Sequence, residues 1–103
     1  MIDLDKEYLD EIVKILKNYI PHARVLAFGS RVEGKAQKYS DFDIAIQGDT
    51  AVPSDLLSRV KDALSATDIP IKIDVLDWHT LTKNFQEIIS RRFEVIQEGR
   101  NND

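Results

Sequence analysis

Two short segments, in which polar or small residues alternate with large aliphatic ones, constrain the fold more than any other feature of the chain. They span residues 41–46 and 71–76. Successive side chains of a strand point to opposite faces, so each segment predicts a strand with one face in the core and one face open. Asp41, Asp43 and Asp74 fall on the open faces. We therefore expect a sheet with acidic side chains on one side.

The rest of the chain predicts helices around this sheet. Apolar residues recur at helical spacing over residues 4–19, again from Leu56 to Leu64, and once more over about 82–91. A short apolar run at 24–28 ends at a glycine and predicts another buried strand. We expect Ser54 to cap the second helix.

The end of the chain is less regular. In the last helix Phe85, Ile88 and Ile89 are expected to face inward. Residues 93–96 are consistent with a terminal strand or with a continuation of the helix, and we favour the strand. With 103 residues, 43% of them hydrophobic and 31% charged, the chain is expected to form one α/β domain over residues 1–103, without a separate recognition domain.

Composition excludes several classes of function. The chain has no cysteine, which excludes disulfides and thiolate metal sites. It has no apolar run of about 20 residues, and its acidic start does not resemble a signal peptide, so we expect a cytoplasmic protein without a membrane partner. The net charge of −4 disfavours long nucleic acids as partners. A single nucleotide bound with a divalent metal remains compatible with this charge.

Residues suited to phosphate chemistry are concentrated in one stretch. Gly29 and Ser30 are followed, after ten residues, by Asp41 and Asp43. Carboxylates at positions i and i+2 of a strand lie on the same side, about 6.6 Å apart at the backbone, and can share a Mg²⁺ or Mn²⁺ ion. Asp74 on another strand could complete a two-metal site. Gly29 allows the backbone to approach a phosphate, and Ser30 offers a hydroxyl and an amide.

This spacing resembles the signature of the DNA polymerase β-like nucleotidyltransferase superfamily. The short length, the run 27–31, Ser40 before the first aspartate and the strand at 73–77 resemble the minimal nucleotidyltransferase (MNT) family, over essentially the whole chain. The resemblance implies a mixed β-sheet flanked by helices. It also implies that Asp41 and Asp43 bind the metal-nucleotide and that Asp74 helps to activate the acceptor hydroxyl.

Other residues near these motifs have expected roles in binding, capping or packing. By the same resemblance Gly29 and Ser30 hold the triphosphate, and we add Arg31 and Ser40 to the predicted nucleotide-binding set. Asp77 is interpreted as a structural cap, because aspartate is common in turns. We interpret His22 and His79 as surface residues, and Trp78 and Phe85 as packing residues.

The family resemblance implies a partner as well. MNT proteins are frequently paired with HEPN-domain toxins, and some transfer AMP from ATP to a toxin tyrosine. Three functions follow: a protein adenylyltransferase, an antitoxin that acts only by stoichiometric binding, and a nucleotidyltransferase for a small molecule. The short chain argues against the third, because nothing in it is available to bind such an acceptor.

Overall fold

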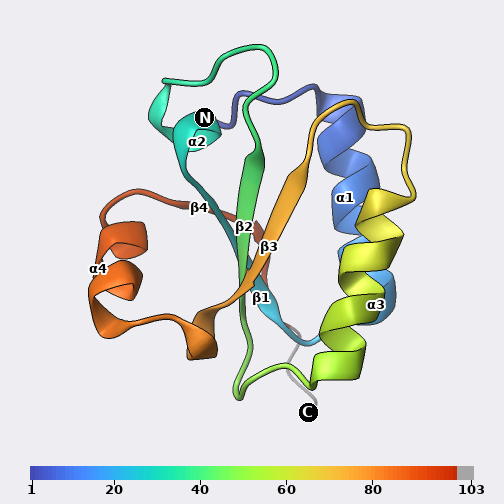
Figure 1. Cartoon of the computed structure of the whole chain (residues 1–103), viewed down its shortest axis with the longest axis vertical. Helices are drawn as coiled ribbons and strands as arrows, with labels where there is room; N and C mark the ends of the chain where they lie inside the picture. Colours follow the sequence, from blue (N-terminus) through green and yellow to red (C-terminus); the bar gives the residue numbers. More distant parts are fainter. Residues whose placement is uncertain (100–103) are drawn as a thin grey trace.

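The protein is built around a mixed four-stranded sheet with the strand order β3-β2-β1-β4 (Figure 1). This computed structural model describes residues 1–99. The strands are β1 (Arg24–Phe28), β2 (Phe42–Gln47), β3 (Ile73–Asp77) and β4 (Glu94–Gln97). The helices are α1 (Lys6–Tyr19), α2 (Ser30–Glu33), α3 (Ser54–Ser65), the short 3₁₀ helix η1 (Trp78–Thr80) and α4 (Lys83–Arg91). Strand β1 pairs antiparallel with β2 and β4, whereas β2 and β3 are parallel. The parallel pair needs a crossover, which α3 provides.

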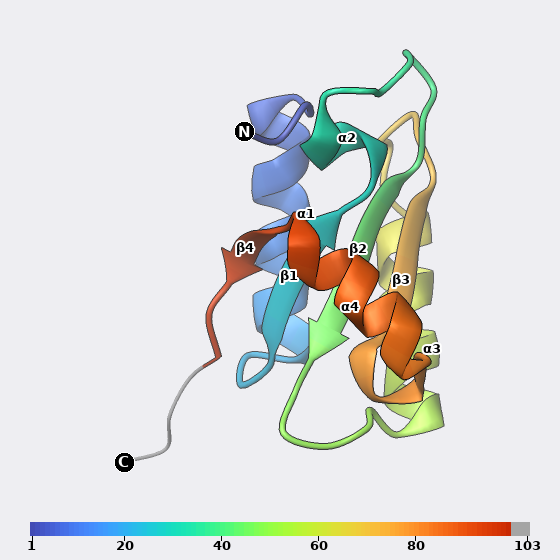
Figure 2. The same ribbon diagram turned by 90° about the vertical axis from the view of Figure 1, so that its left-hand side faces the viewer.

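The two faces of the sheet are covered unequally. Helices α1 and α3 pack on one face, and α4 crosses the other (Figures 1 and 2). The larger core lies on the α1 and α3 side and contains Ile12, Ile44 and Val60, all fully buried. The smaller core lies under α4 and includes Leu26, Ala45 and Ile89. In Figure 2, α4 crosses the lower part of its face, whereas α2 lies at the top.

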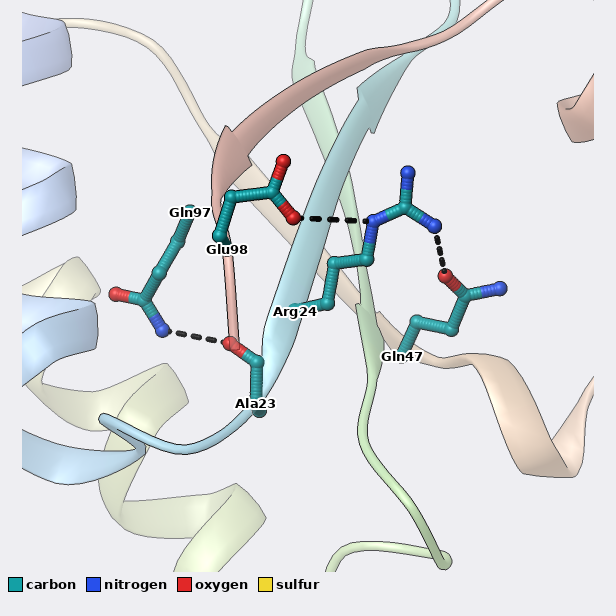
Figure 3. Close-up of polar contacts among 5 residues, drawn as sticks. All are labelled: Ala23, Arg24, Gln47, Gln97 and Glu98. Carbon is teal, nitrogen blue, oxygen red and sulfur yellow. Dashed lines mark hydrogen bonds and ion pairs between the residues drawn. The ribbon is translucent and has the colours of Figure 1, made fainter. Parts of the chain in front are cut away.

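The terminal strand is tied to the rest of the molecule by side chains (Figure 3). The buried Gln97 donates from Nε2 to the carbonyl of Ala23 at 2.8 Å. Arg24 donates to Gln47 Oε1 at 3.1 Å, and its Nε lies 3.7 Å from Glu98 Oε1. The β4 edge of the sheet is thus held by residues from three separate parts of the chain.

Most predicted elements are confirmed. Strand β1 has the predicted bounds, and the terminal segment is a strand. Strand β2 begins at Phe42, which leaves Asp41 just outside it, and β3 extends from Ile73 to Asp77. The predicted starts of these two strands are therefore too early, because Asp41, Ile71 and Lys72 lie outside them, and the alternation holds within β2 and β3 themselves.

Two side-chain predictions are wrong. Ser54 is the first residue of α3 and not its cap, because Pro53 adopts the extended backbone (ψ 140°) that precedes the helix. Ile88 is 47% exposed, whereas Ile89 is 1% exposed. Helix α4 covers the sheet with the stripe formed by Phe85 and Ile89, four residues apart, and Ile88 lies beside that stripe.

No helix within residues 1–99 is long and apolar enough to cross a membrane.

Candidate active site

Gly29 forms the turn between β1 and α2 and lies directly against Asp43. Its φ of 82° and ψ of −161° belong to a region that essentially only glycine adopts. Phe28 is the register partner of Asp43 in the sheet, so the chain leaves β1 beside this carboxyl group. A Cβ at position 29 would collide with Asp43 Oδ2 and would lie 3.2 Å from Asp43 Cγ. The glycine is therefore required by space as well as by backbone conformation.

Asp43 and Asp74 stand side by side on parallel strands. They are register partners in the β2-β3 pair, where neighbouring strands lie about 4.8 Å apart. Both are half-buried on the face that α4 partly covers, whereas Asp41, one residue before β2, is exposed. Alternation predicts that Asp41, Asp43 and Asp74 lie on one face. The register brings Asp43 and Asp74 together, whereas Asp41 lies just before β2 and is not part of the strand.

The electrostatics of the site reflect this grouping. The pKa of Asp43 is raised from 3.8 to about 6, mainly by burial and in addition by the negative charges of Asp74 and Asp41. Lys72 acts in the opposite direction and lowers the pKa of Asp43. The sequence assigns no role to Lys72. Its position two residues before Asp74 nevertheless predicts that the two side chains lie on the same face of the sheet.

The donor atoms suit a hard divalent cation. Within residues 1–99, no three His, Cys, Asp or Glu side chains form a cluster that could by itself hold a metal ion. Mg²⁺, however, is commonly bound by one or two carboxylates together with substrate phosphates and water. The negative charges of Asp74 and Asp41 repel that of Asp43, and a bound cation would relieve this repulsion. These residues therefore suit a metal ion that binds together with a nucleotide better than they suit a metal ion that binds alone.

Arg31 organises the loop that leads to the carboxylates. Its side chain is 7% exposed and donates to four backbone carbonyls. The acceptors are those of Asp3 at 2.7 Å, Ser40 at 3.0 Å, Lys38 at 3.1 Å and Gln37 at 3.4 Å. The Ser40 hydroxyl in turn accepts from the Gln37 amide at 2.8 Å. The predicted phosphate contacts of Arg31 and Ser40 remain predictions, and the contacts present hold the loop in place.

The interpretation of Asp77 as a structural residue is confirmed. Its buried carboxylate accepts from the amide of Val52 at 2.7 Å and from that of His79 at 3.0 Å. It thereby joins the end of β3 to the loop before α3. Trp78 and Phe85 pack against the smaller core, as expected.

Comparisons with known proteins agree with this geometry. Residues 10–101 match the family model described as polymerase beta, nucleotidyltransferase. The chain is 46% identical over 99 residues to the probable protein adenylyltransferase MntA of Haemophilus influenzae, which covers 94% of this chain and 85% of that protein.

Solved structures share the fold. One is a toxin-antitoxin complex with AMP-PNP, which matches with a TM-score of 0.71 and 21% identity over 89% of this chain and 74% of that one. Another is a tri-AMPylated HEPN toxin of Shewanella oneidensis in complex with an MNT antitoxin, with a TM-score of 0.67 and 20% identity over 92% of this chain and 73% of that one. At these identities the likeness is one of fold.

The contact between Gly29 and Asp43 predicts that Gly29→Ala lowers the free energy of unfolding by roughly 1–3 kcal/mol, because alanine is strained at this φ and collides with the carboxylate. Gly34→Ala is the matched control: Gly34 also has a positive φ, of 75°, but a Cβ there meets nothing within 4 Å. Urea unfolding of both variants measures the difference. Equal losses would show that backbone strain alone, and not the close approach to Asp43, requires the glycine.

The raised pKa of Asp43 predicts a pH-dependent stability. In the folded protein this group holds its proton up to about pH 6, whereas in the unfolded chain it loses it near 3.8. Its ionisation therefore destabilises the folded state progressively as the pH rises from about 4 to 6. Asp43→Asn should be more stable than the parent at pH 8 in EDTA by roughly 1–2 kcal/mol, after allowance for solvent screening, and no more stable near pH 3.5.

Chemical unfolding across this pH range tests the prediction. Asp49→Asn, at an exposed position on another loop, controls for the loss of one negative charge. A gain from Asp43→Asn that is the same at pH 3.5 and pH 8 would contradict the raised pKa of Asp43.

The contacts of Arg31 predict that Arg31→Lys lowers the free energy of unfolding by about 1–3 kcal/mol and speeds amide exchange in residues 35–41, because an ammonium group cannot reach four dispersed carbonyls. Lys35→Ala removes an exposed loop cation and should change little. A variant with unchanged stability but weaker ATP binding would instead indicate that Arg31 contacts phosphate directly.

Proposed function

The chain belongs to the polymerase beta nucleotidyltransferase family, and from that premise we propose that it transfers AMP from metal-bound ATP to a hydroxyl group of a partner protein. The family model covers almost the whole chain. The identity of 46% to a protein adenylyltransferase supports a protein as acceptor over a small molecule.

The partner that we propose is a HEPN-domain toxin, with this chain as its antitoxin. Support comes from solved complexes of the same fold, in which an MNT antitoxin is bound to a HEPN toxin and the toxin carries AMP groups. A related toxin-antitoxin structure contains AMP-PNP, which supports ATP as the substrate. We place this reaction in the cytoplasm, as the sequence leads us to expect.

The observation that carries the proposal is the packing of Asp43 against the Gly29 turn, with Asp74 as its register partner. A backbone turn without a Cβ lies next to two carboxylates on neighbouring strands. We assign the triphosphate to Gly29 and Ser30, with Arg31 and Ser40 as further nucleotide-binding residues. This assignment brings the triphosphate to the glycine turn, next to the carboxylates.

Asp41, Asp43 and Asp74 are the residues that would hold the metal, with Mg²⁺ or Mn²⁺ favoured by their oxygen donors. When bound, the ion neutralises phosphate charge. Lys72 adds a fixed positive charge near Asp43 and keeps the carboxylates from repelling the nucleotide still more strongly.

Asp74 is the carboxylate that we assign to the acceptor. It lies on the opposite side of Asp43 from the Gly29 turn, because β2 stands between β1 and β3. A hydroxyl beside Asp74 can donate its proton to that carboxylate as its oxygen bonds to the α-phosphorus and pyrophosphate leaves. We assign the positioning of this hydroxyl to the partner, since residues 1–99 form one sheet and its covering helices.

The proposal predicts metal-dependent labelling of a protein. The purified chain is mixed with Mg²⁺, α-labelled ATP and the product of the neighbouring gene, and peptide mass spectrometry locates the added AMP. Asp41→Asn or Asp43→Asn should reduce labelling by at least 100-fold, whereas Asp49→Asn should retain it. EDTA should abolish labelling, and excess Mg²⁺ or Mn²⁺ should restore it.

Two other results would redirect the assignment. Neutralisation of the partner that is equally strong without ATP, and in Asp43→Asn, would indicate a stoichiometric antitoxin. Label that appears in small molecules and never in the partner would indicate a small-molecule nucleotidyltransferase.

A further inference from the structure

Within residues 1–99, Asp74 stands on a strand whose outer edge has no strand partner. Strand β3 is the first in the order β3-β2-β1-β4, and its pairing within the sheet is with β2. The Gly29 turn follows β1, on the far side of β2. A group that reaches Asp74 without crossing the proposed nucleotide position therefore approaches from the β3 edge.

A groove of about 400 Å³ lies along this edge. Helix α3 contributes Lys61, Leu64 and Ser65 to its wall, and residues 71–75 form the other wall. Figure 1 shows α3 beside β3, with the connecting segment returning at the top. Asp74 belongs to the lining. Its side chain is on the face that α4 partly covers, so a segment in the groove reaches this carboxylate only around the β3 edge.

The backbone in the groove can pair with another extended chain. The amide of Phe42 donates to the carbonyl of Lys72 at 2.9 Å, so Lys72 directs its backbone groups toward β2. Backbone groups alternate in direction along a strand, which directs those of Ile73, the first residue of β3, to the free edge. Val75 is only 3% exposed, so the accessible edge ends before it.

The side chains around the groove indicate the kind of segment that fits. Lys61 and Lys72 are exposed there, although the chain as a whole carries a net charge of −4. They favour acidic residues in the occupant. A strand paired at this edge would place alternate side chains on the Asp74 face and on the α3 face. The hydroxyl-bearing residue belongs on the first, and an apolar residue that contacts Ile71 and Ile73 on the second.

We propose that the partner protein presents its acceptor hydroxyl on a short, extended, acidic segment that pairs with the free edge of β3 in the groove between β3 and α3. This inference rests on the proposed function for the identity of the acceptor. The docking geometry itself depends only on the edge and the groove.

The first test blocks the groove from the helix side. Ser65 is exposed at the end of α3 and lines the groove, so Ser65→Trp fills it without entering the core. Ser58→Trp is the matched control, since Ser58 is exposed on the same helix two turns earlier and does not line the groove. Ser65→Trp should raise KM for the partner at least tenfold with little change in kcat or in ATP binding, and Ser58→Trp should resemble the parent.

The second test does not require catalysis. Amide hydrogen exchange of the chain is measured alone and with the partner, without ATP. The amide of Ile73 should exchange at least tenfold more slowly in the complex. The amide of Asp74 points toward β2 and should change less.

The results separate the two proposals. A partner that is labelled while the edge amides stay unprotected and Ser65→Trp remains fully active would overturn the docking geometry and leave the proposed function standing. Protection of the edge without any label would support the docking geometry and count against AMP transfer. Protection that appears without partner, together with a dimeric mass in solution, would assign the edge to a second copy of the chain and overturn the proposal.

Discussion

The close approach of the Gly29 backbone to the Asp43 carboxylate is the constraint on which the other features of the site depend. The β1-β2 register sets it, because Phe28 pairs with Asp43 and the chain must leave the sheet at that point. A residue with a Cβ would have to push the carboxylate aside or break the register. The long connection that follows must then return to the start of β2, and the buried Arg31 fixes its course through four carbonyl contacts.

The same constraint concentrates negative charge that folding alone would not favour. Asp43 is half-buried between a glycine turn and a second carboxylate, and burial and repulsion together oppose its ionisation. The strands that carry it are supported from the opposite face by Phe42, Ile44 and Val75, which are buried against α1 and α3. The larger core therefore stabilises a sheet whose other face carries a destabilised site, an arrangement common at functional positions.

Alternation of polar and apolar residues predicted the strands and the face that carries Asp43 and Asp74, because that pattern is local. The pairing partners of each strand were harder to predict from the sequence, because the register depends on contacts between distant segments. Arg31 shows the difference. From the sequence it was a loop cation near a phosphate, but its burial depends on a contact with Asp3, 28 residues away. The exposure of Ile88 had the same origin, because the packing angle of α4 decides which side of the helix meets the sheet. The roles of the site residues remain predictions.

The two edges of the sheet are treated differently, and the difference bears on function. The β4 edge is tied down by Gln97 and Arg24 and lies far from the carboxylates in strand order. The β3 edge carries Asp74 and has no strand partner in the part of the chain that the structure describes. An unpaired edge invites association with other chains, and proteins restrain it with lysines, short length or covering elements. Here Lys72 lies on the edge and Val75 is covered, so only a short stretch is open. The features that limit unspecific pairing thus also limit any docked strand to the stretch beside Asp74, where the proposed chemistry requires its hydroxyl.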